Sequence, residues 1–293
     1  MIYALSRPVF RGAIFFLTTA GYSGIIFLII IRKVSDHMKE KVLLFDLDGT
    51  LLTGEKTISP RTLDELRRCR EKGYIIGVAT SRSTGNSTRF TEALSPELVI
   101  SDGGAMVREN GRVIICEAFS GEETSGIIAC VREVCGNVSI TVDTREGEHL
   151  RNYVPEQDAL EASWGQSSFN DFSDFAESSL KICAEVFDEA DAAKMAEALP
   201  QCDCIRFTDG FWYKLTRAGV NKESAVIRLC EHMGITPADI AAFGDDLADI
   251  GMLRLCGRGI AMGNSCDEVK QIADEVIGSN DEDGIADFLH KYV

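Results

Sequence analysis

The stretch Lys41-Val42-Leu43-Leu44-Phe45-Asp46-Leu47-Asp48-Gly49-Thr50 decides the fold of this chain. Four apolar residues, 42–45, precede two aspartates that lie one residue apart and a Gly-Thr turn. An apolar run of this length is typical of a strand buried in a parallel sheet. Ligands of open α/β sheets bind beyond the carboxyl ends of the strands. Asp46 and Asp48 are therefore predicted to lie at the edge of the sheet, within reach of a substrate.

The Asp-x-Asp pattern has a chemical interpretation and a plain structural one. Two carboxylates held close together repel each other, which favours a shared proton or a bound cation. Gly49 permits the turn that brings both side chains to one end of the strand. Mg2+ would take one carboxylate and a nearby backbone carbonyl, and the carboxylates could then serve as nucleophile and general acid/base. A solvated turn after a core strand would show the same pattern.

A second apolar run, Ile75–Ala79, predicts a strand that ends at Thr80-Ser81-Arg82. A hydroxyl and a guanidinium at the end of a strand suit a phosphoryl group. A Ser/Thr helix cap would account for the same residues.

Two later segments add a lysine and an acidic cluster. Asn221 is the expected N-cap of a helix that runs to Met233, and Lys222 in its first turn opposes the helix dipole. A strand over 240–243 leads into Gly244-Asp245-Asp246-Leu247-Ala248-Asp249, a cluster of the kind that a Mg2+ site needs. A solvated lysine and an acidic loop are the plain alternatives.

In this order along the chain, the four motifs resemble those of the haloacid dehalogenase (HAD) superfamily. The segments Gly-Ile-Ala-Met-Gly-Asn at 259–264 and Asn-Asp-Glu-Asp-Gly-Ile-Ala at 280–286 are similar to its Cof-type, or type IIB, branch. The resemblance runs from about Lys41 to the C-terminus. It implies an α/β fold, with a doubly wound, Rossmann-like parallel-sheet core and an inserted α+β type IIB cap.

The resemblance also implies a role for each motif residue. Asp46 matches the nucleophile that forms an aspartyl-phosphate, and Asp48 matches the acid/base. Thr80 matches the hydroxyl that holds the transferring phosphoryl group. Lys222 matches the lysine that neutralises the nucleophile and the phosphate.

The implied cofactor is Mg2+, and further residues would serve it or the substrate. The metal would be held by Asp46, by the backbone carbonyl of Asp48 and by Asp245, with Asp249 as a supporting carboxylate. The residues expected to contact the substrate are Ser81, Arg82 and Gly49.

Two positions depart from the family pattern. Ala248 stands where relatives usually carry an asparagine, and Gly103-Gly104-Ala105 stands where Asn-Gly-Ala is often found. Losing one hydrogen bond to a charged group costs on the order of 1.5–3 kcal/mol, so Ala248 is expected to weaken activity rather than abolish it.

The function implied is a Mg2+-dependent phosphatase that hydrolyses a small phosphorylated metabolite, such as a sugar phosphate, through an aspartyl-phosphate. A phosphotransferase or mutase of the same superfamily is one alternative. A catalytically weakened regulatory binding protein is the other, and Ala248 is the reason to consider it.

Composition limits the partners. The chain has 293 residues and a net charge of −16, which disfavours nucleic acid because phosphate backbones favour basic surfaces. A small anionic substrate remains compatible, since a metal and a lysine dominate the local field. The ten cysteines form no Cys-x-x-Cys pair and are interpreted as reduced thiols. The oligomeric state is not predicted.

The N-terminal segment has two interpretations. Residues 12–31 carry no charge over twenty positions and are followed by Arg32-Lys33, a length that can span a bilayer. Residues 1–37 are then a membrane anchor that leaves the catalytic part in the cytoplasm. Alternatively, Met38 is the natural start and 1–37 is an upstream extension of a cytoplasmic protein.

The change in pattern along the chain predicts its domains. Residues 38–116 and 214–293 form the core, with a helix over 60–73 and further strands at 98–100 and 112–116. Residues 117–213 form the cap. Its predicted helices are 122–134 and 188–199, and its predicted strands are 138–142, 180–187, 204–208 and 211–215. A polar loop is expected at 155–177. Trp164, His149, Trp212 and Tyr213 could contact a sugar, although core packing is the preferred interpretation.

Overall fold

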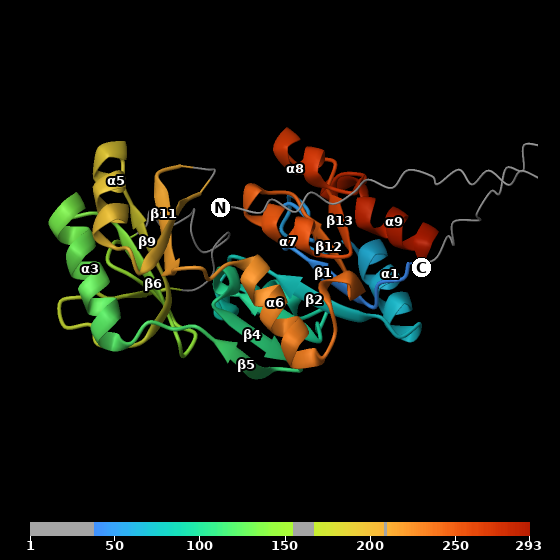
Figure 1. Cartoon of the computed structure of the whole chain (residues 1–293), viewed down its shortest axis with the longest axis horizontal. Coiled ribbons are helices and arrows are strands. Elements are labelled where there is room, and N and C mark those ends of the chain that lie inside the picture. The colour runs from blue at the N-terminus through green and yellow to red at the C-terminus, as the bar shows by residue number, and fades with distance from the viewer. Residues whose placement is uncertain (1–37, 155–166, 208–209) are drawn as a thin grey trace, which may run out of the picture. The chain divides into compact units, whose positions relative to one another are not determined.

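The computed structural model describes residues 38–154, 167–207 and 210–293, which belong to one compact unit of the chain (Figure 1). These residues contain one sheet of eight strands and one of six. The predicted apolar span at 12–31 and Trp164 lie outside the described residues.

The eight-stranded sheet has the strand order β14-β13-β12-β1-β2-β3-β4-β5. Its strands are β1 (Val42–Phe45), β2 (Ile75–Ala79), β3 (Leu98–Ser101), β4 (Met106–Glu109), β5 (Arg112–Cys116), β12 (Ile240–Gly244), β13 (Arg258–Ala261) and β14 (Glu275–Val276). Neighbours from β14 to β3 are parallel, which confirms the α/β core. The antiparallel edge formed by β4 and β5 was not predicted. Its cause is local, because Asn110-Gly111 takes positive φ at both residues and closes a tight hairpin.

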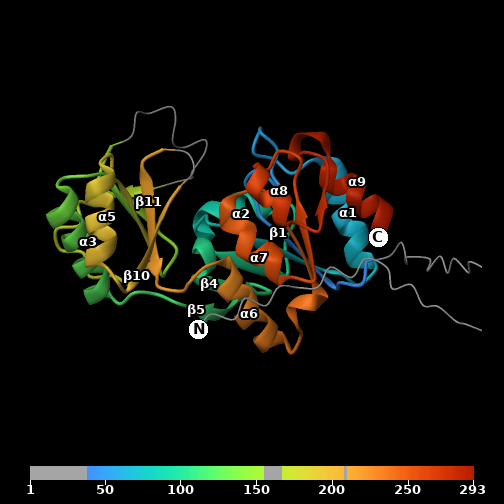
Figure 2. The same cartoon turned by 45° about the horizontal axis from the view of Figure 1, so that its top comes forward.

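Helices cover both faces of this sheet. They are α1 (Pro60–Glu71), α2 (Thr84–Thr91), α6 (Lys222–Met233), α7 (Ile250–Leu255), α8 (Asp267–Ile272) and α9 (Gly284–Tyr292). Side chains alternate along β1, so Leu43 and Phe45 pack in a cluster with α1 and α9, which lie side by side in Figures 1 and 2. Val42 and Leu44 join the cluster on the opposite face, under α6 and α7. This two-sided burial explains why β1 is continuously apolar.

The six-stranded sheet forms the cap, in the order β10-β11-β9-β6-β7-β8. Its strands are β6 (Ile140–Thr144), β7 (His149–Arg151), β8 (Ser168–Phe169), β9 (Ser179–Glu185), β10 (Cys202–Arg206) and β11 (Trp212–Arg217). The helices α3 (Gly121–Cys135) and α5 (Glu189–Ala198) pack in one apolar cluster with Ile140, Ile182 and Leu215 of the sheet. The α+β cap is thereby confirmed, and β8 occupies part of the predicted 155–177 loop.

The cap sheet keeps β11 paired through Arg217, beyond the predicted limit between residues 213 and 214. The division of the chain into domains stays a prediction. The opposite face of the cap sheet is polar. Asp143, Lys181 and Thr216 alternate with the apolar residues that the helices cover, as do Cys183 and Lys214.

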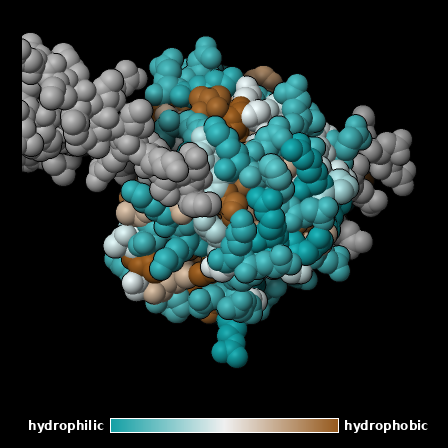
Figure 3. All heavy atoms as spheres, turned by 90° about the vertical axis from the view of Figure 1, so that its right-hand side faces the viewer, coloured by the Kyte–Doolittle hydropathy of each residue, from teal (hydrophilic) through white to brown (hydrophobic). Residues whose placement is uncertain are grey.

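The described residues in Figure 3 present a face on which hydrophilic side chains predominate and hydrophobic ones are scattered. This agrees with the burial of apolar residues in the clusters on the two faces of the core sheet. Among the helices described, none combines the length and the apolar character needed to cross a bilayer.

Candidate active site

The parallel register of β1, β2 and β12 places the residues that follow them at one edge of the sheet. Phe45 is aligned with Val78 and with Phe243, and the rings of Phe45 and Phe243 stack at 4.4 Å between centroids. Asp46, Thr80 and Asp245 follow these strands directly or within one residue. The sheet thus brings together polar residues that are far apart in the sequence.

Lys222 joins this edge as the first residue of α6. The Asn221 side chain caps the helix by accepting a hydrogen bond from the Ser224 N–H at 2.9 Å. The buried Lys222 Nζ lies 2.5 Å from Asp46 Oδ1 and 2.7 Å from Asp249 Oδ1. Burial lowers the pKa of Lys222, but the charges of Asp249 and Asp46 outweigh it and the pKa is raised. Lys222 is therefore a firmly protonated cation between two carboxylates.

Asp249 shapes the acidic loop after β12. It is fully buried, and its Oδ2 accepts hydrogen bonds from the backbone N–H groups of Asp245 and Asp246, both at 3.1 Å. Its other oxygen contacts Lys222. Asp249 thus connects the loop that carries Asp245 to the lysine of α6.

The carboxylates of Asp46, Asp245 and Asp249 form a group that fits a metal ion, with one oxygen of each within 4.8 Å of the others. Burial raises the pKa of Asp46 well above its usual range. The charge of Lys222 lowers this pKa and the charge of Asp249 raises it, but burial is the largest effect. Burial likewise raises the pKa of Asp245 to about 6, with a further contribution from Asp249. Three carboxylates around one ammonium leave an excess of negative charge, which a divalent cation would compensate. Both oxygens of Asp249 accept hydrogen bonds, from Lys222 and from the loop, whereas Asp46 and Asp245 each bond to another described side chain through Oδ1. Asp46 and Asp245 would therefore hold the cation.

Asp48 lies outside that group of three. Arg82 binds it through Nε–H to Oδ2 at 2.6 Å and through Nη2–H to Oδ1 at 2.8 Å, and Lys56 Nζ adds a contact at 2.8 Å. Burial alone raises the pKa of Asp48, but the hydrogen bonds and charges of Arg82 and Lys56 outweigh it and the pKa is lowered. Arg82, expected to contact substrate, thus binds a carboxylate in this structure and also lies over the Phe90 ring.

The residues after β2 are held in place by hydrogen bonds. Thr80 is buried, and its Oγ1 accepts a hydrogen bond from the Arg82 N–H at 3.0 Å. The carbonyl of Ser81 accepts one from Lys181 of the cap sheet at 2.8 Å. The helix cap considered as an alternative is provided by Ser83, whose side chain accepts from the Asn86 N–H.

Gly49 is required by both conformation and space. Its φ is +77°, and a Cβ at this position would lie 2.2 Å from Asp245 Oδ2. A side chain here would therefore occupy the position of the Asp245 carboxylate.

Sequence reasoning missed three residues that support the site. Thr50 Oγ1 donates to Asp245 Oδ1 at 2.6 Å, and Asn264 Nδ2 donates to the Gly49 carbonyl at 2.7 Å. Lys56 is the third, through its contact with Asp48. Thr50 lies within residues 41–50 and Asn264 within residues 259–264. Neither sequence pattern indicates that these side chains bond to residues far away in the chain.

The described residues that were considered as sugar contacts pack against other protein groups. His149 Nδ1 lies 2.6 Å from Asp143 Oδ1, and Trp212 packs against the Tyr153 ring at 5.9 Å between centroids. Tyr213 packs against the cap cluster. Ala248 is exposed on the acidic loop.

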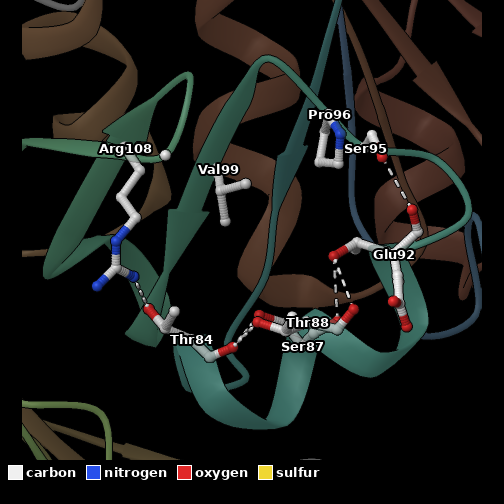
Figure 4. Close-up of a pocket in the computed structure, with 10 residues that line it drawn as sticks. Thr84, Ser87, Thr88, Glu92, Ser95, Pro96, Val99 and Arg108 are labelled. Atoms are coloured by element: carbon white, nitrogen blue, oxygen red, sulfur yellow. Dashed lines mark hydrogen bonds between the residues drawn. The ribbon is translucent and has the colours of Figure 1, made fainter.

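A separate hollow of about 230 Å³ lies between α2 and the strands β3 and β4 (Figure 4). Hydroxyl side chains such as Thr84 and Thr88 line it, and Arg108 points to Thr84 from β4. None of the predicted site residues lines this hollow. It is therefore not the candidate active site.

The α/β core with an acidic group and a buried lysine at its strand ends defines a hydrolase of the phosphoryl-transfer type. A family model described as haloacid dehalogenase-like hydrolase matches residues 43–289. The chain belongs to this family.

Among curated relatives, a 5-amino-6-(5-phospho-D-ribitylamino)uracil phosphatase of Bacillus subtilis is 25% identical over 275 residues, which cover 87% of this chain and 98% of the relative. A phosphoglycolate phosphatase of Archaeoglobus fulgidus is 27% identical over 253 residues, with 86% and 96% covered. A solved HAD subclass IIB sugar phosphatase matches with a TM-score of 0.72 and 25% identity, covering 85% of this chain and 98% of that one. The predicted Cof-type, IIB branch and the prediction of a phosphoric monoester hydrolase are confirmed by these relatives.

Proposed function

We propose that this protein is a Mg2+-dependent phosphatase that hydrolyses a small phosphorylated metabolite through an aspartyl-phosphate on Asp46. The observation that supports this most directly is the contact between Lys222 and Asp46 inside a group of three clustered carboxylates. Phosphoryl transfer depends mainly on positioning and on neutralising charge. Lys222 supplies positive charge, and the carboxylates would hold a cation that supplies more.

In the first step, one oxygen of Asp46 attacks the phosphorus and the bond to the leaving oxygen breaks. Lys222 holds the other oxygen, Oδ1, which fixes the orientation of the carboxylate. Thr80, Lys222 and the backbone amides after Asp46 would stabilise the charge on the phosphoryl oxygens. A Mg2+ held by Asp46, the Asp48 carbonyl and Asp245 would supply further positive charge next to the phosphoryl group.

Asp48 donates a proton to the leaving alkoxide, then takes one from the water that cleaves the aspartyl-phosphate. Arg82 and Lys56 lower the Asp48 pKa and so favour its ionised form, the form that can accept a proton in the second role. Proton donation in the first step requires Asp48 to separate from at least one of these cations. The phosphate of the substrate is an alternative binding partner for Arg82 and for Lys56.

The substrate is proposed to be a small phosphate ester such as a sugar phosphate. The relatives named above act, by their names, on a phosphoribityl compound, on phosphoglycolate and on sugar phosphates. All are small phosphorylated molecules, which agrees with a site at the edge of the core sheet beneath a cap.

The test is phosphate release from p-nitrophenyl phosphate with MgCl2. The Asp46→Asn variant should lose activity by at least about 10³-fold, because the nucleophile is removed. Asp64→Asn, an exposed carboxylate of α1 paired with Arg67, is the matched control and should retain activity. EDTA should abolish turnover and Mg2+ should restore it. Retained activity in Asp46→Asn would refute the assigned nucleophile, and a phosphorylated acceptor as the main product would indicate a transferase.

A further inference from the structure

Lys214, on strand β11 of the cap, is a cation that is almost completely buried. Its side chain is on the polar face of the cap sheet, and only 5% of the residue is exposed. Within residues 38–154, 167–207 and 210–293, no hydrogen bond or ion pair to its Nζ occurs. Its Nζ is not one of the fully enclosed polar atoms among the described residues, so the ammonium keeps a small exposed surface that an anion can reach. A nearly buried charge is costly unless it is paired, and an anion at this surface would pair it.

Lys214 lies against a turn that borders the candidate active site. A Cβ on Gly103 would be 2.9 Å from its Nζ, so the ammonium lies against the turn Asp102–Gly104. The Gly103 N–H donates to the Thr80 carbonyl at 3.1 Å. On the other side of the turn, a Cβ on Gly104 would lie 2.2 Å from the carbonyl oxygen of Asn221, the N-cap of the helix that carries Lys222. The turn therefore contacts Lys214 as well as the segments that carry Thr80 and Lys222.

The neighbouring charges do not compensate Lys214. Lys181 and Lys222 have carboxylates of their own, Asp143 for the first and Asp46 with Asp249 for the second. Asp203 of β10 is the acid across the strand pair, and its Oδ2 accepts a hydrogen bond from the Gly219 N–H instead. Burial lowers the pKa of Lys214 to about 8, and the charges of Lys181 and Lys222 add to this effect. At neutral pH the side chain is still mainly protonated and lacks a counter-anion.

Gly103 explains how the ammonium reaches this place. The position carries no side chain, has φ of +70° and leaves room for Nζ. Gly103 is the residue that departs from the Asn-Gly-Ala pattern of relatives, and the ammonium of Lys214 lies beside it. An anion that binds Lys214 would contact both the cap and the turn beside Thr80.

We propose that Lys214 binds a second anionic group of the substrate, a carboxylate or a second phosphate in the leaving group. This inference rests on the proposed phosphatase function and narrows its substrate class. Lys222 and Thr80 would hold the phosphoryl group that is transferred. Lys214, because it belongs to the cap, would select the part of the molecule that leaves.

The test compares two pairs of esters that differ by one charge. 3-Phosphoglycerate carries a carboxylate where glycerol 3-phosphate has a hydroxymethyl group, and fructose 1,6-bisphosphate carries a second phosphate that fructose 6-phosphate lacks. The wild-type enzyme should prefer the more anionic member of at least one pair in kcat/KM. Which pair shows the preference distinguishes a carboxylate from a phosphate. Lys214→Met should reduce that preference by roughly 10- to 100-fold, the range of one hydrogen bond between charged groups.

Two further variants separate recognition from general effects. Lys194→Met removes an exposed lysine of cap helix α5 and should leave the preference unchanged, which controls for net charge. Gly103→Asn keeps Lys214 but places a side chain where its Nζ lies, in a conformation that asparagine tolerates. It should reduce the preference as Lys214→Met does.

Binding measurements keep this inference separate from the proposed function. Calorimetric titration of Asp46→Asn with the same esters should show tighter binding of the more anionic member, and the double variant with Lys214→Met should lose the difference. Turnover without such a preference, or a preference that survives Lys214→Met, would overturn the role of Lys214 and leave the phosphatase intact. Absent turnover on every ester, with Lys214-dependent binding retained, would overturn the phosphatase alone.

Discussion

At the scale of single residues, Asp249 shows how a buried carboxylate can organise a site. Two backbone N–H groups and Lys222 all donate to it, so its two oxygens are fully used. The neighbouring Asp246 instead caps the short helix η3 (Leu247–Asp249) through the Leu247 N–H and is half-buried. Asp246 and Asp249 belong to the same acidic loop, but their carboxylates accept hydrogen bonds from different groups.

This difference predicts opposite outcomes for two matched substitutions. Asp249→Asn should lower the free energy of unfolding by about 1–3 kcal/mol, since an amide cannot accept from all three donors. It should also lower kcat, because Lys222 loses a partner that positions it. Asp246→Asn should change both much less. Urea unfolding and p-nitrophenyl phosphate turnover measure the two effects, and equal losses in both variants would contradict the assignment.

At the scale of elements, local signals predicted the helices α1, α3, α5 and α6 and most of the described strands. Asn221 and Gly234 bound α6 as expected, the first as N-cap and the second in a left-handed conformation. The elements without a prediction are helices α2, α7, α8 and α9 and strands β4, β7, β8, β13 and β14. Helix α2 and strand β4 show why. Helix α2 has few strong helix formers, and β4 is stabilised by pairing on both sides. Such elements depend on tertiary contacts that a local pattern does not contain.

The turn after β1 gives an element-scale prediction. Gly49 and Gly73 both have positive φ, so a Cβ strains either backbone by roughly 1–2 kcal/mol. Only at Gly49 would the Cβ also meet Asp245, whereas nothing lies within 4 Å at Gly73. Both Gly→Ala variants should therefore lose similar stability from strain, and Gly49→Ala alone should lose activity and Mg2+ affinity. Isothermal titration with Mg2+ tests this, and a fully active Gly49→Ala enzyme would contradict it.

At the scale of the whole molecule, a buried charge cluster connects the cap sheet to the site. Lys181 contacts Asp143 at 2.7 Å and the Ser81 carbonyl at 2.8 Å, so one lysine links β9 to the turn after β2. His149 contacts the same aspartate, and Asp102 is the other buried acid nearby. Burial raises the pKa of Asp143, but Lys181 and His149 outweigh it and lower the pKa to about 2.

This lowered pKa predicts how stability depends on pH. The folded state binds the Asp143 proton less well than the unfolded state, so its contribution is present above the unfolded pKa and is lost as pH falls from about 4 to about 2. A shift of about two units corresponds to roughly 2–3 kcal/mol. Asp143→Asn should therefore be less stable than wild type at pH 6, and the difference should shrink toward pH 2. Asp191→Asn, which breaks an exposed pair on α5, is the control and should cost less than about 1 kcal/mol. A difference that persists unchanged at pH 2 would contradict the prediction.

The sequence by itself determined the strands that end at Asp46, Thr80 and Asp245 and the cap of the helix at Lys222. Apolar runs, glycines and capping residues act over a few neighbours, so they can be recognised without a structure. The tertiary structure was needed to show that Lys222 pairs with Asp46 and Asp249, that Arg82 holds Asp48 and that Lys214 lies against Gly103. Those contacts join segments distant in the chain, and their geometry is set by sheet register and by packing between core and cap.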